Sequence, residues 1–229
     1  MIKWAMREPK YNLVCVAHPD DETLFFGGLL QRRKNLPWMV VCATDANADG
    51  EGKLRFKQFK KACTTLGVDH IEWWAFPDRF EKRLPSEELI SRLQDLPRPN
   101  EIFTHGIMGE YRHPHHQDVS YCVHQAFARH PRVYSVAYNT YPTLKIQLSK
   151  KEFEIKTRIL TKIYGSETTR FLNLLPATFT EGFLQLEAGE VSALYDFFAH
   201  GKPLQTKKLK THAWLASYLR QNPAISRPF

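Results

Sequence analysis

Residues 12–23 read NLVCVAHPDDET, and the expected fold is organised around this stretch. Its first half is continuously apolar and rich in β-branched residues, which is typical of a buried strand in the middle of a parallel sheet. Pro19 ends the strand because proline cannot donate a hydrogen bond to a neighbouring strand. Three acids and then an apolar run, Leu24 to Leu30, follow. An imidazole and carboxylates are therefore expected between a strand and a helix, at the sheet edge where ligands bind in open α/β sheets.

The polar part of this stretch predicts a metal site. His18 and Asp21 are ligand types that together suit zinc. Asp20 lies between them, and an adjacent carboxylate can serve as the base for a metal-bound water. The alternative is helix capping, in which the acids only favour the positive end of the following helix. Capping explains neither the histidine nor three successive acids, so the metal-site interpretation is preferred.

The bulk composition indicates a single α/β domain over residues 1–229, or one domain with a small appendage. Hydrophobic residues make up 43% of the chain and aromatic residues 13%, which is enough for a substantial core. No apolar run approaches the roughly 20 residues of a membrane span, and the N-terminus lacks a secretory signal, so a cytoplasmic protein is expected. The four cysteines form no Cys-x-x-Cys pair, which favours buried, reduced thiols over a cysteine metal site.

The net charge of +8 allows an anionic partner such as a nucleotide-sugar, a phospholipid head group or nucleic acid. The basic residues are scattered, and their densest cluster lies at 202–210, within a basic C-terminal tail or helix over residues 200–229. A solvated tail is the preferred interpretation. No zinc-finger or RNA-binding signature accompanies it, so no nucleic-acid partner is expected.

Apolar strand-like runs alternate with helical patterns along the chain, which predicts a mostly parallel sheet with helices on both faces. The expected strands are 11–17, 38–43, 71–76, 101–105 and 132–138. The expected helices are 22–34, 54–66, one from Ser86, one reaching about 130, 150–164 and 190–199. Gly27 and Gly28 inside the first helix indicate close packing against the sheet or a backbone that approaches the site.

A second informative stretch, residues 106–118, reads GIMGEYRHPHHQD and follows the predicted fourth strand. It holds three histidines within four residues. His116, at the start of the next helix, could complete a His-Asp-His zinc site and leave a position for water. A surface histidine cluster is the alternative. Because both motifs are expected at the same sheet edge, the ligand interpretation is favoured.

Arg55 stands in the first turn of the predicted helix 54–66, where a cation does not favour the helix dipole. Its position is compatible with a ligand-facing role or with an exposed, solubilising arginine, and spacing alone does not choose between them.

Residues 17–22, AHPDDE, match the signature of the PIG-L/LmbE-like N-acetylglucosaminyl deacetylases. The resemblance continues in the order of that family: Thr44-Asp45 before a glycine-containing loop, Arg55, LGV at 66–68 and Pro77-Asp78. HPHH at 113–116 resembles the second motif, usually HPDH. A weaker similarity is seen at 163–167, IYGSE. The clear match covers residues 11–130.

This resemblance implies a Rossmann-like fold and a hydrolase that removes the N-acetyl group of a GlcNAc-type amino sugar or its conjugate. It implies zinc, with other divalent metals as alternatives. The residue roles carried over are metal binding by His18, Asp21 and His116, general base catalysis by Asp20, oxyanion support or amine protonation by His113, and the holding of a substrate hydroxyl or phosphate by Arg55. The positive net charge favours a phosphate-bearing sugar. Six aromatic residues are candidates for stacking on a sugar ring, although most are expected in the core: Trp73, Trp74, Phe76, Phe80, Tyr111 and Tyr141.

The chain departs from the family pattern at His115, where an aspartate is common. A histidine cannot supply the fixed negative charge that would orient and charge its neighbour, and Asp118 is one substitute partner for His113. Gln58 also lies near the place of a frequent glutamate. Two alternatives belong to other classes of protein. One is a non-catalytic sugar-binding descendant, against which the intact motif residues argue. The other is a nucleic-acid binder, which a steep loss of binding with added salt would reveal.

Overall fold

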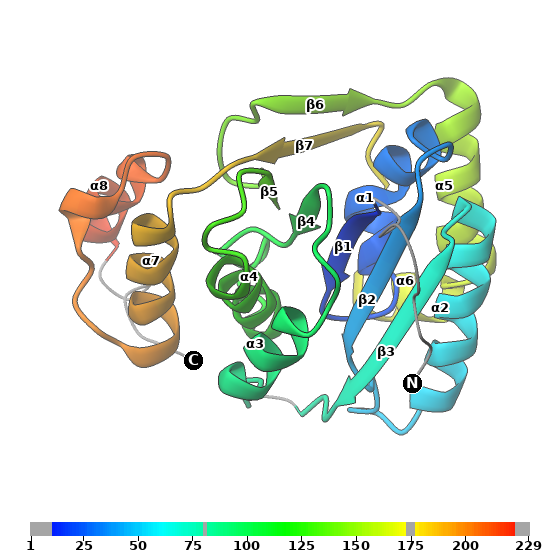
Figure 1. The fold of residues 1–229 in the computed structure, drawn as a ribbon, viewed down its shortest axis with the longest axis horizontal. Coiled ribbons are helices and arrows are strands. Elements are labelled where there is room, and N and C mark those ends of the chain that lie inside the picture. Colours follow the sequence, from blue (N-terminus) through cyan, green and yellow to red (C-terminus); the bar gives the residue numbers. More distant parts are fainter. Residues whose placement is uncertain (1–10, 80–81, 173–176, 223–229) are drawn as a thin grey trace.

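The computed structural model describes residues 11–79, 82–172 and 177–222, except for the side chains of 170–172. A seven-stranded sheet with the order β3-β2-β1-β4-β5-β7-β6 forms its centre (Figure 1). The strands are β1 (Asn12–Val16), β2 (Trp38–Thr44), β3 (His70–Phe76), β4 (Ile102–Thr104), β5 (Val133–Val136), β6 (Leu144–Gln147) and β7 (Thr180–Leu184). The first five strands pair in parallel, and β7 pairs antiparallel with both β5 and β6. The predicted mostly parallel α/β sheet is confirmed, and the antiparallel pair at one edge is an addition to it.

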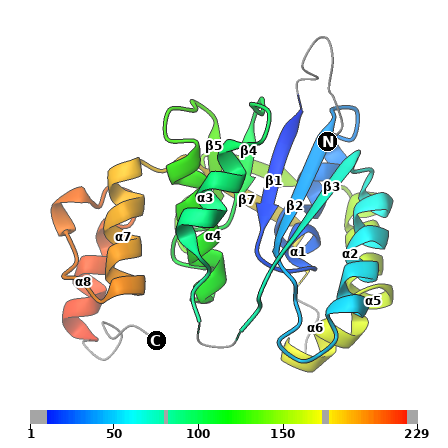
Figure 2. The same ribbon diagram turned by 60° about the horizontal axis from the view of Figure 1, so that its bottom comes forward.

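Helices cover both faces of the sheet (Figures 1 and 2). The helices are α1 (Asp21–Arg32), α2 (Gly52–Leu66), α3 (Ser86–Gln94), α4 (Pro114–Ala126), α5 (Lys150–Lys162), α6 (Gly165–Leu172), α7 (Ala188–His200), the 3₁₀ turn η1 (Thr206–Lys208) and α8 (Ala213–Gln221). Residues of α1, α2 and α5 pack on one face, and those of α3 and α4 on the other. The C-terminal helices extend this second layer, since Tyr195 of α7 stacks on Tyr121 of α4 with ring centroids 3.9 Å apart.

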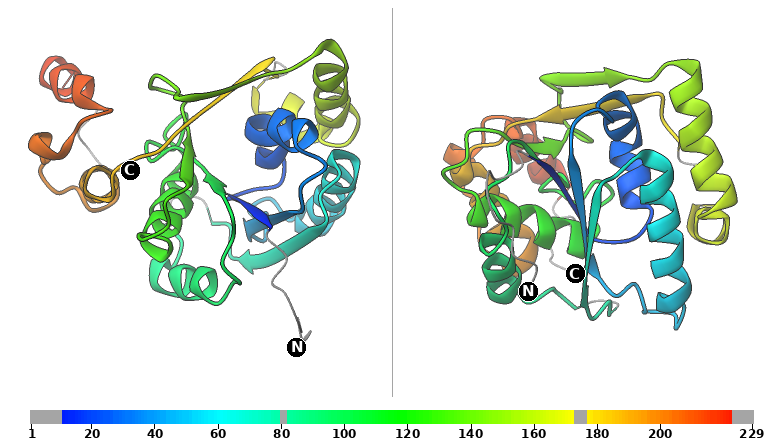
Figure 3. Two further views of the ribbon diagram at one scale, coloured as in Figure 1. Left: turned by 45° about the horizontal axis from the view of Figure 1, so that its top comes forward. Right: turned by 45° about the vertical axis from the view of Figure 1, so that its right-hand side comes forward.

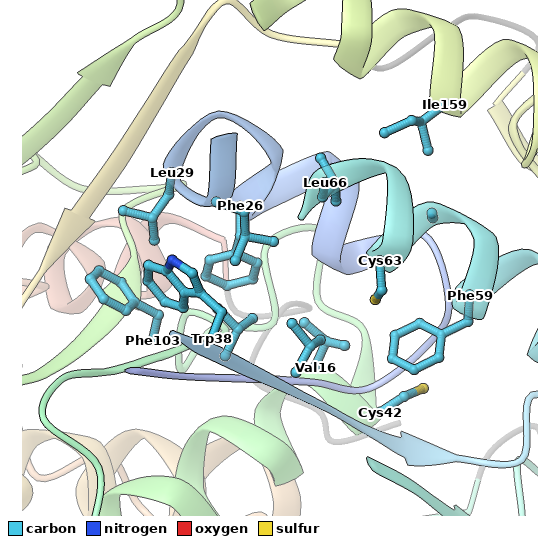
Figure 4. Packing of buried hydrophobic residues seen from close by; sticks show 14 of the residues in the cluster. Val16, Phe26, Leu29, Trp38, Cys42, Phe59, Cys63, Leu66, Phe103 and Ile159 are labelled. Carbon is cyan, nitrogen blue, oxygen red and sulfur yellow. The ribbon is translucent and has the colours of Figure 1, made fainter. Parts of the chain in front are cut away.

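The central strands are buried on both faces, as their continuous apolar sequences predict. Every residue of β1 and β2 is buried. Figure 4 shows part of the core over β1 and β2, where Phe26 of α1 and Phe59 of α2 meet Trp38 and Val16. The four cysteines are free and buried, as expected.

The strand order explains where the two polar motifs meet. From β1 the chain moves outward through β2 and β3, and it then returns to the other side of β1 with β4 and β5. Ligands in open α/β sheets bind at this reversal, beside the carboxyl ends of the strands. The motif at 18–22 follows β1 and the stretch at 105–116 follows β4, so the topology brings both to one crevice.

A buried ion pair lies against the middle of α1, at Gly28 and Leu29. Lys156 Nζ of α5 is 2.8 Å from Glu181 Oε1 of β7, and the amides of Gly28 and Leu29 donate to the two carboxylate oxygens at 2.7 and 2.8 Å. We call these four residues the Lys156–Glu181 cluster. A Cβ at Gly28 would lie 2.4 Å from Leu148 Cδ1 and 3.0 Å from Glu181 Oε2. The predicted close packing at Gly28 is thus confirmed, and its neighbours belong to β7 and to the residue after β6.

Several boundaries differ from the sequence predictions. The helix expected to reach about residue 130 ends at Ala126, and the fifth strand is shorter than 132–138. Residues 200–222 are partly helical, with η1 and α8 (Figure 3), while 223–229 lie outside the described residues. No helix of the described part of the chain has the length and apolar character needed to cross a membrane.

Candidate metal and catalytic site

The loop after β1 turns His18 and Asp21 toward each other. The His18 amide donates to Asp21 Oδ2 at 2.8 Å, and His18 Nδ1 lies 3.6 Å from the same oxygen. Asp20 between them has a φ of 101°, in the left-handed region that a side chain strains to occupy. This backbone turn lets α1 begin at Asp21 directly after the strand.

His116, from the first turn of α4, completes the group. Its Nε2 lies 3.4 Å from Asp21 Oδ2, and its Nδ1 donates to Glu110 Oε2 at 2.6 Å. With the proton on Nδ1, Nε2 presents a lone pair to a carboxylate oxygen. This buried nitrogen has no hydrogen-bond partner among the described residues. Two electron-rich atoms in this arrangement fit a cation between them, and the ligand atoms of His18, Asp21 and His116 all lie within 4.8 Å of one another.

Glu110 and His105 belong to the site and were not predicted from the sequence. Glu110 Oε1 accepts the Gly106 amide at 2.7 Å, while Oε2 receives His116 and lies 3.2 Å from His105 Nδ1. His105 Nε2 accepts the Ala17 amide at 3.0 Å, which ties β4 to the end of β1. Glu110 thus holds a metal-ligand candidate in one tautomer, as a carboxylate partner of a histidine ligand does. The only sequence signal was an acid between two histidines after a strand.

Asp20 lies beside this group with its side chain partly exposed. Burial and Asp21 raise the pKa of Asp20 above its usual range, and Arg55 opposes them. Arg55 is 7% exposed, so the alternative of an exposed, solubilising arginine is wrong. Its Nη2 donates to Pro19 O at 3.0 Å and lies 3.7 Å from Asp20 Oδ2. The guanidinium therefore supports the backbone and the carboxylate of the proposed base.

His113 caps α4, and none of the carboxylates in the described residues pairs with it. Its Nδ1 accepts the His115 amide at 3.2 Å, which leaves its proton on Nε2. The suggested substitute partner, Asp118, is wrong. The Asp118 carboxylate instead receives Arg83 at 3.1 Å, the Leu84 amide at 2.9 Å and Tyr195 at 2.8 Å. Burial and the neighbouring His18 lower the pKa of His113, so its ring is neutral.

The aromatic residues considered for stacking on a sugar ring fall into a buried and an exposed group. Trp74 and Phe76 are buried, and Trp73 packs against Phe59 in the core. Tyr111 is 57% exposed, and its ring centroid lies 5.3 Å from that of His116. Tyr141 is exposed on the segment before β6. Phe80 lies outside the described residues.

His18 is the most basic of the predicted ligands. Burial disfavours its imidazolium form, but the Asp21 and Asp78 carboxylates outweigh burial and raise the pKa of His18 to about 9. The protein therefore holds positive charge at this point, and a cation bound at the ring takes the place of a proton.

Comparison with known proteins agrees with the motifs. Residues 13–127, half of the chain, match the family model described as PIG-L, GlcNAc-PI de-N-acetylase. The chain belongs to this family.

Its sequence relatives include the uncharacterized protein L374 of Acanthamoeba polyphaga mimivirus, 26% identical over 67% of this chain and 75% of that protein. A probable N-acetylglucosaminyl-phosphatidylinositol de-N-acetylase of Dictyostelium discoideum is 36% identical over 26% of this chain and 24% of that protein. The match to this enzyme therefore spans about a quarter of its length.

Solved structures share the fold. The N,N'-diacetylchitobiose deacetylase of Pyrococcus horikoshii superposes with a TM-score of 0.58 and 18% identity, over 78% of this chain and 84% of that one. GalB of Pseudomonas putida, a 4-carboxy-2-hydroxymuconate hydratase, superposes with a TM-score of 0.54 and 17% identity, over 76% of this chain and 95% of that one. One fold thus hosts more than one reaction, and the reaction must be argued from the site.

Proposed function

We propose that this protein is a zinc-dependent N-deacetylase that hydrolyses the acetamide of a GlcNAc-type amino sugar or its conjugate. The observation that carries this proposal is the unpartnered, buried Nε2 of His116, which faces Asp21 Oδ2 at 3.4 Å with His18 beside both. A cation accounts for this arrangement, and the membership of the PIG-L family supports deacetylation as its use.

Zinc at His18, Asp21 and His116 would supply Lewis-acid polarisation of the acetyl carbonyl and a water of lowered pKa. Asp20 takes the proton from the attacking water, because it lies between His18 and Asp21 in the sequence and its partly exposed carboxylate contacts Arg55 rather than a ligand histidine. His113 donates its Nε2–H to the oxyanion of the tetrahedral intermediate. The proton held by Asp20 is then available to the departing amine, which leaves as a neutral group.

The substrate class follows from the family and from groups near the site. Tyr111 offers an exposed ring for the apolar face of a sugar. Arg55, although buried, is a cation close to Asp20 that could receive a hydroxyl or a phosphate, and the net charge of +8 favours an anionic conjugate. We take residues 1–229 as one deacetylase domain that acts in the cytoplasm, where a lipid-linked substrate would be met at the membrane surface.

The test is acetate release from N-acetylated amino sugars that are free, nucleotide-linked or inositol-phospholipid-linked. Asp20→Asn should keep zinc and lose turnover by about 10²–10⁴-fold. Asp69→Asn is the matched control, since this carboxylate accepts the Trp38 amide at the opposite end of the sheet. Full turnover in Asp20→Asn would show that the base is another group.

The non-catalytic sugar-binding descendant is distinguished in the same experiment. Saturable sugar binding without acetate release, from protein shown to hold zinc, would establish it in place of the deacetylase.

A further inference from the structure

His115 occupies the position where the family usually has an aspartate, and its ring contacts a predicted metal ligand. His115 Nδ1 lies 3.1 Å from His18 Nε2. The ring is buried and is held on its far side, where Nε2 lies 2.8 Å from the carbonyl oxygen of Lys82. A carbonyl oxygen only accepts, so His115 Nε2 carries a proton. In the neutral ring the other nitrogen, Nδ1, is then an acceptor.

The direction of this hydrogen bond fixes the tautomer of His18. Because His115 Nδ1 accepts, the proton between the two rings belongs to His18 Nε2. When a cation takes the place of the second proton, the lone pair of His18 therefore lies on Nδ1, the nitrogen 3.6 Å from Asp21 Oδ2. The hydrogen bonds form a chain, in which the Lys82 carbonyl orients His115 and His115 orients His18.

We propose that His115 is a positioning residue that holds the metal ligand His18 in its Nε2-protonated tautomer. This inference rests on the proposed zinc site. Histidine ligands commonly donate their second N–H to an acceptor that sets the ring orientation. Glu110 does this for His116, and His115 does it for His18. The missing negative charge at position 115 is therefore replaced by a neutral acceptor that serves a different histidine.

The same rings also define a group of His18, His113 and His115 that could hold a second cation. His18 would have to use Nε2 there while Nδ1 serves the first site. His113 Nδ1 is already occupied by the His115 amide. Asp78 Oδ1 lies 3.4 Å from His115 Nδ1 and 3.7 Å from His18 Nε2, so both acceptors face the N–H of His18. The orienting role uses every contact as it stands, whereas a second ion requires His18 to give up a proton from both nitrogens.

The experiment compares two variants of similar size in the full chain. Asn at position 115 places an oxygen near the site of the Nδ1 acceptor, and Leu removes it. We expect His115→Leu to weaken zinc binding by about 10–100-fold in chelator competition, and His115→Asn to restore most of the affinity. His124→Leu is the matched control, since His124 is also buried in α4 but contacts Ser120 and Ser135.

A direct readout is the tautomer of His18 in zinc-loaded protein, from ¹⁵N-histidine NMR. Parent protein with His18 protonated on Nε2 supports the inference. His115→Leu that folds and binds zinc as tightly as the parent would overturn it, as would two zinc ions in the parent and one in the variant. If the parent protein binds one zinc but releases no acetate, only the proposed deacetylase activity is contradicted. If the parent protein binds no zinc, both the deacetylase activity and the positioning role of His115 are contradicted.

Discussion

The protein buries two polar clusters against α1. They differ in whether their buried polar atoms have hydrogen-bond partners. In the Lys156–Glu181 cluster, the ammonium and both carboxylate oxygens each have a hydrogen-bond partner at 2.7–2.8 Å. At the first turn of α1, Asp21 is surrounded by His18, His105 and His116 at 3.4–3.6 Å, and His116 Nε2 has no partner in the described structure. A buried cluster whose polar atoms have partners within the protein requires no ligand, so its role is structural. An incomplete one indicates a ligand, because an unpaired buried polar group costs free energy.

Removing a ligand from the incomplete cluster should have the largest effect on function. His116→Ala deletes the unpartnered Nε2, and we expect zinc affinity to fall by more than the roughly 10–100-fold typical of losing a partner of a ligand. Turnover should fall with it, while the apoprotein stays folded. Zinc content after gel filtration and thermal unfolding measure the two effects. Stoichiometric zinc in this variant would move the third ligand to His113 or His115.

The completed cluster should respond in the opposite way. Lys156→Met leaves the Glu181 carboxylate buried without its cation, and we expect the free energy of unfolding to drop by about 3–5 kcal/mol. Turnover per folded molecule should not change, because the pair lies away from the site. Denaturant unfolding measures the loss. The double variant Lys156→Met/Glu181→Gln should recover part of it, and no recovery would mean that packing rather than charge was lost.

Glu110 tests whether the incomplete cluster depends on its supports. The Glu110 carboxylate accepts one hydrogen bond from the Gly106 amide and one from His116 Nδ1. Glu110→Gln keeps the shape of the side chain, but its NH₂ group cannot accept, so one of these two hydrogen bonds is lost. We expect zinc affinity to fall by about 10–100-fold with a smaller loss of stability. Glu72→Gln is the control, because the half-buried Glu72 carboxylate on β3 also contacts a histidine, His70, away from the site. Unchanged affinity would show that Glu110 organises only its loop.

The two glycines of α1 give the smallest contrast. Gly28→Ala places a methyl 2.4 Å from Leu148, so overpacking of about 1–3 kcal/mol should exceed the gain of about 1 kcal/mol in helix propensity. At Gly27 the nearest atoms lie at 3.6–3.7 Å, so Gly27→Ala should stabilise. Melting temperatures of the pair check both signs. Equal shifts would show that Leu148 moves aside freely.

The sequence predicts the parts of the fold in which one segment carries the whole signal. Strands β1 and β2 are continuous apolar runs, and apolar residues recur at helical spacing along α5. The pair β6 and β7 escapes prediction because its strands are short and 32 residues apart, with α5 and α6 between them. The edge strand β6 has exposed residues and lacks the apolar run that marks a central strand.

The residues of the site also differ in whether one segment of sequence predicts them. His18 and Asp21 are three residues apart in one loop, so their proximity is local. Glu110 and His105 gain their roles only when β4 lies beside β1. Asp118 misleads because residues two apart on a helix point to nearly opposite sides, so it cannot follow His116 into the site. The residue roles of His18, Asp20, Asp21, Arg55, His113 and His116 stay predictions, and the Asp20 and His116 variants above test two of them directly.

The φ of 101° at Asp20 has a consequence for how this protein would change under selection. Glycine adopts this conformation without strain, whereas an L side chain pays roughly 1–2 kcal/mol. A population screened for heat resistance alone would therefore enrich Asp20→Gly, and its survivors would be sturdier and inactive. Persistence of the aspartate under a screen that also requires growth on the product sugar would show that the strain is maintained by its chemistry.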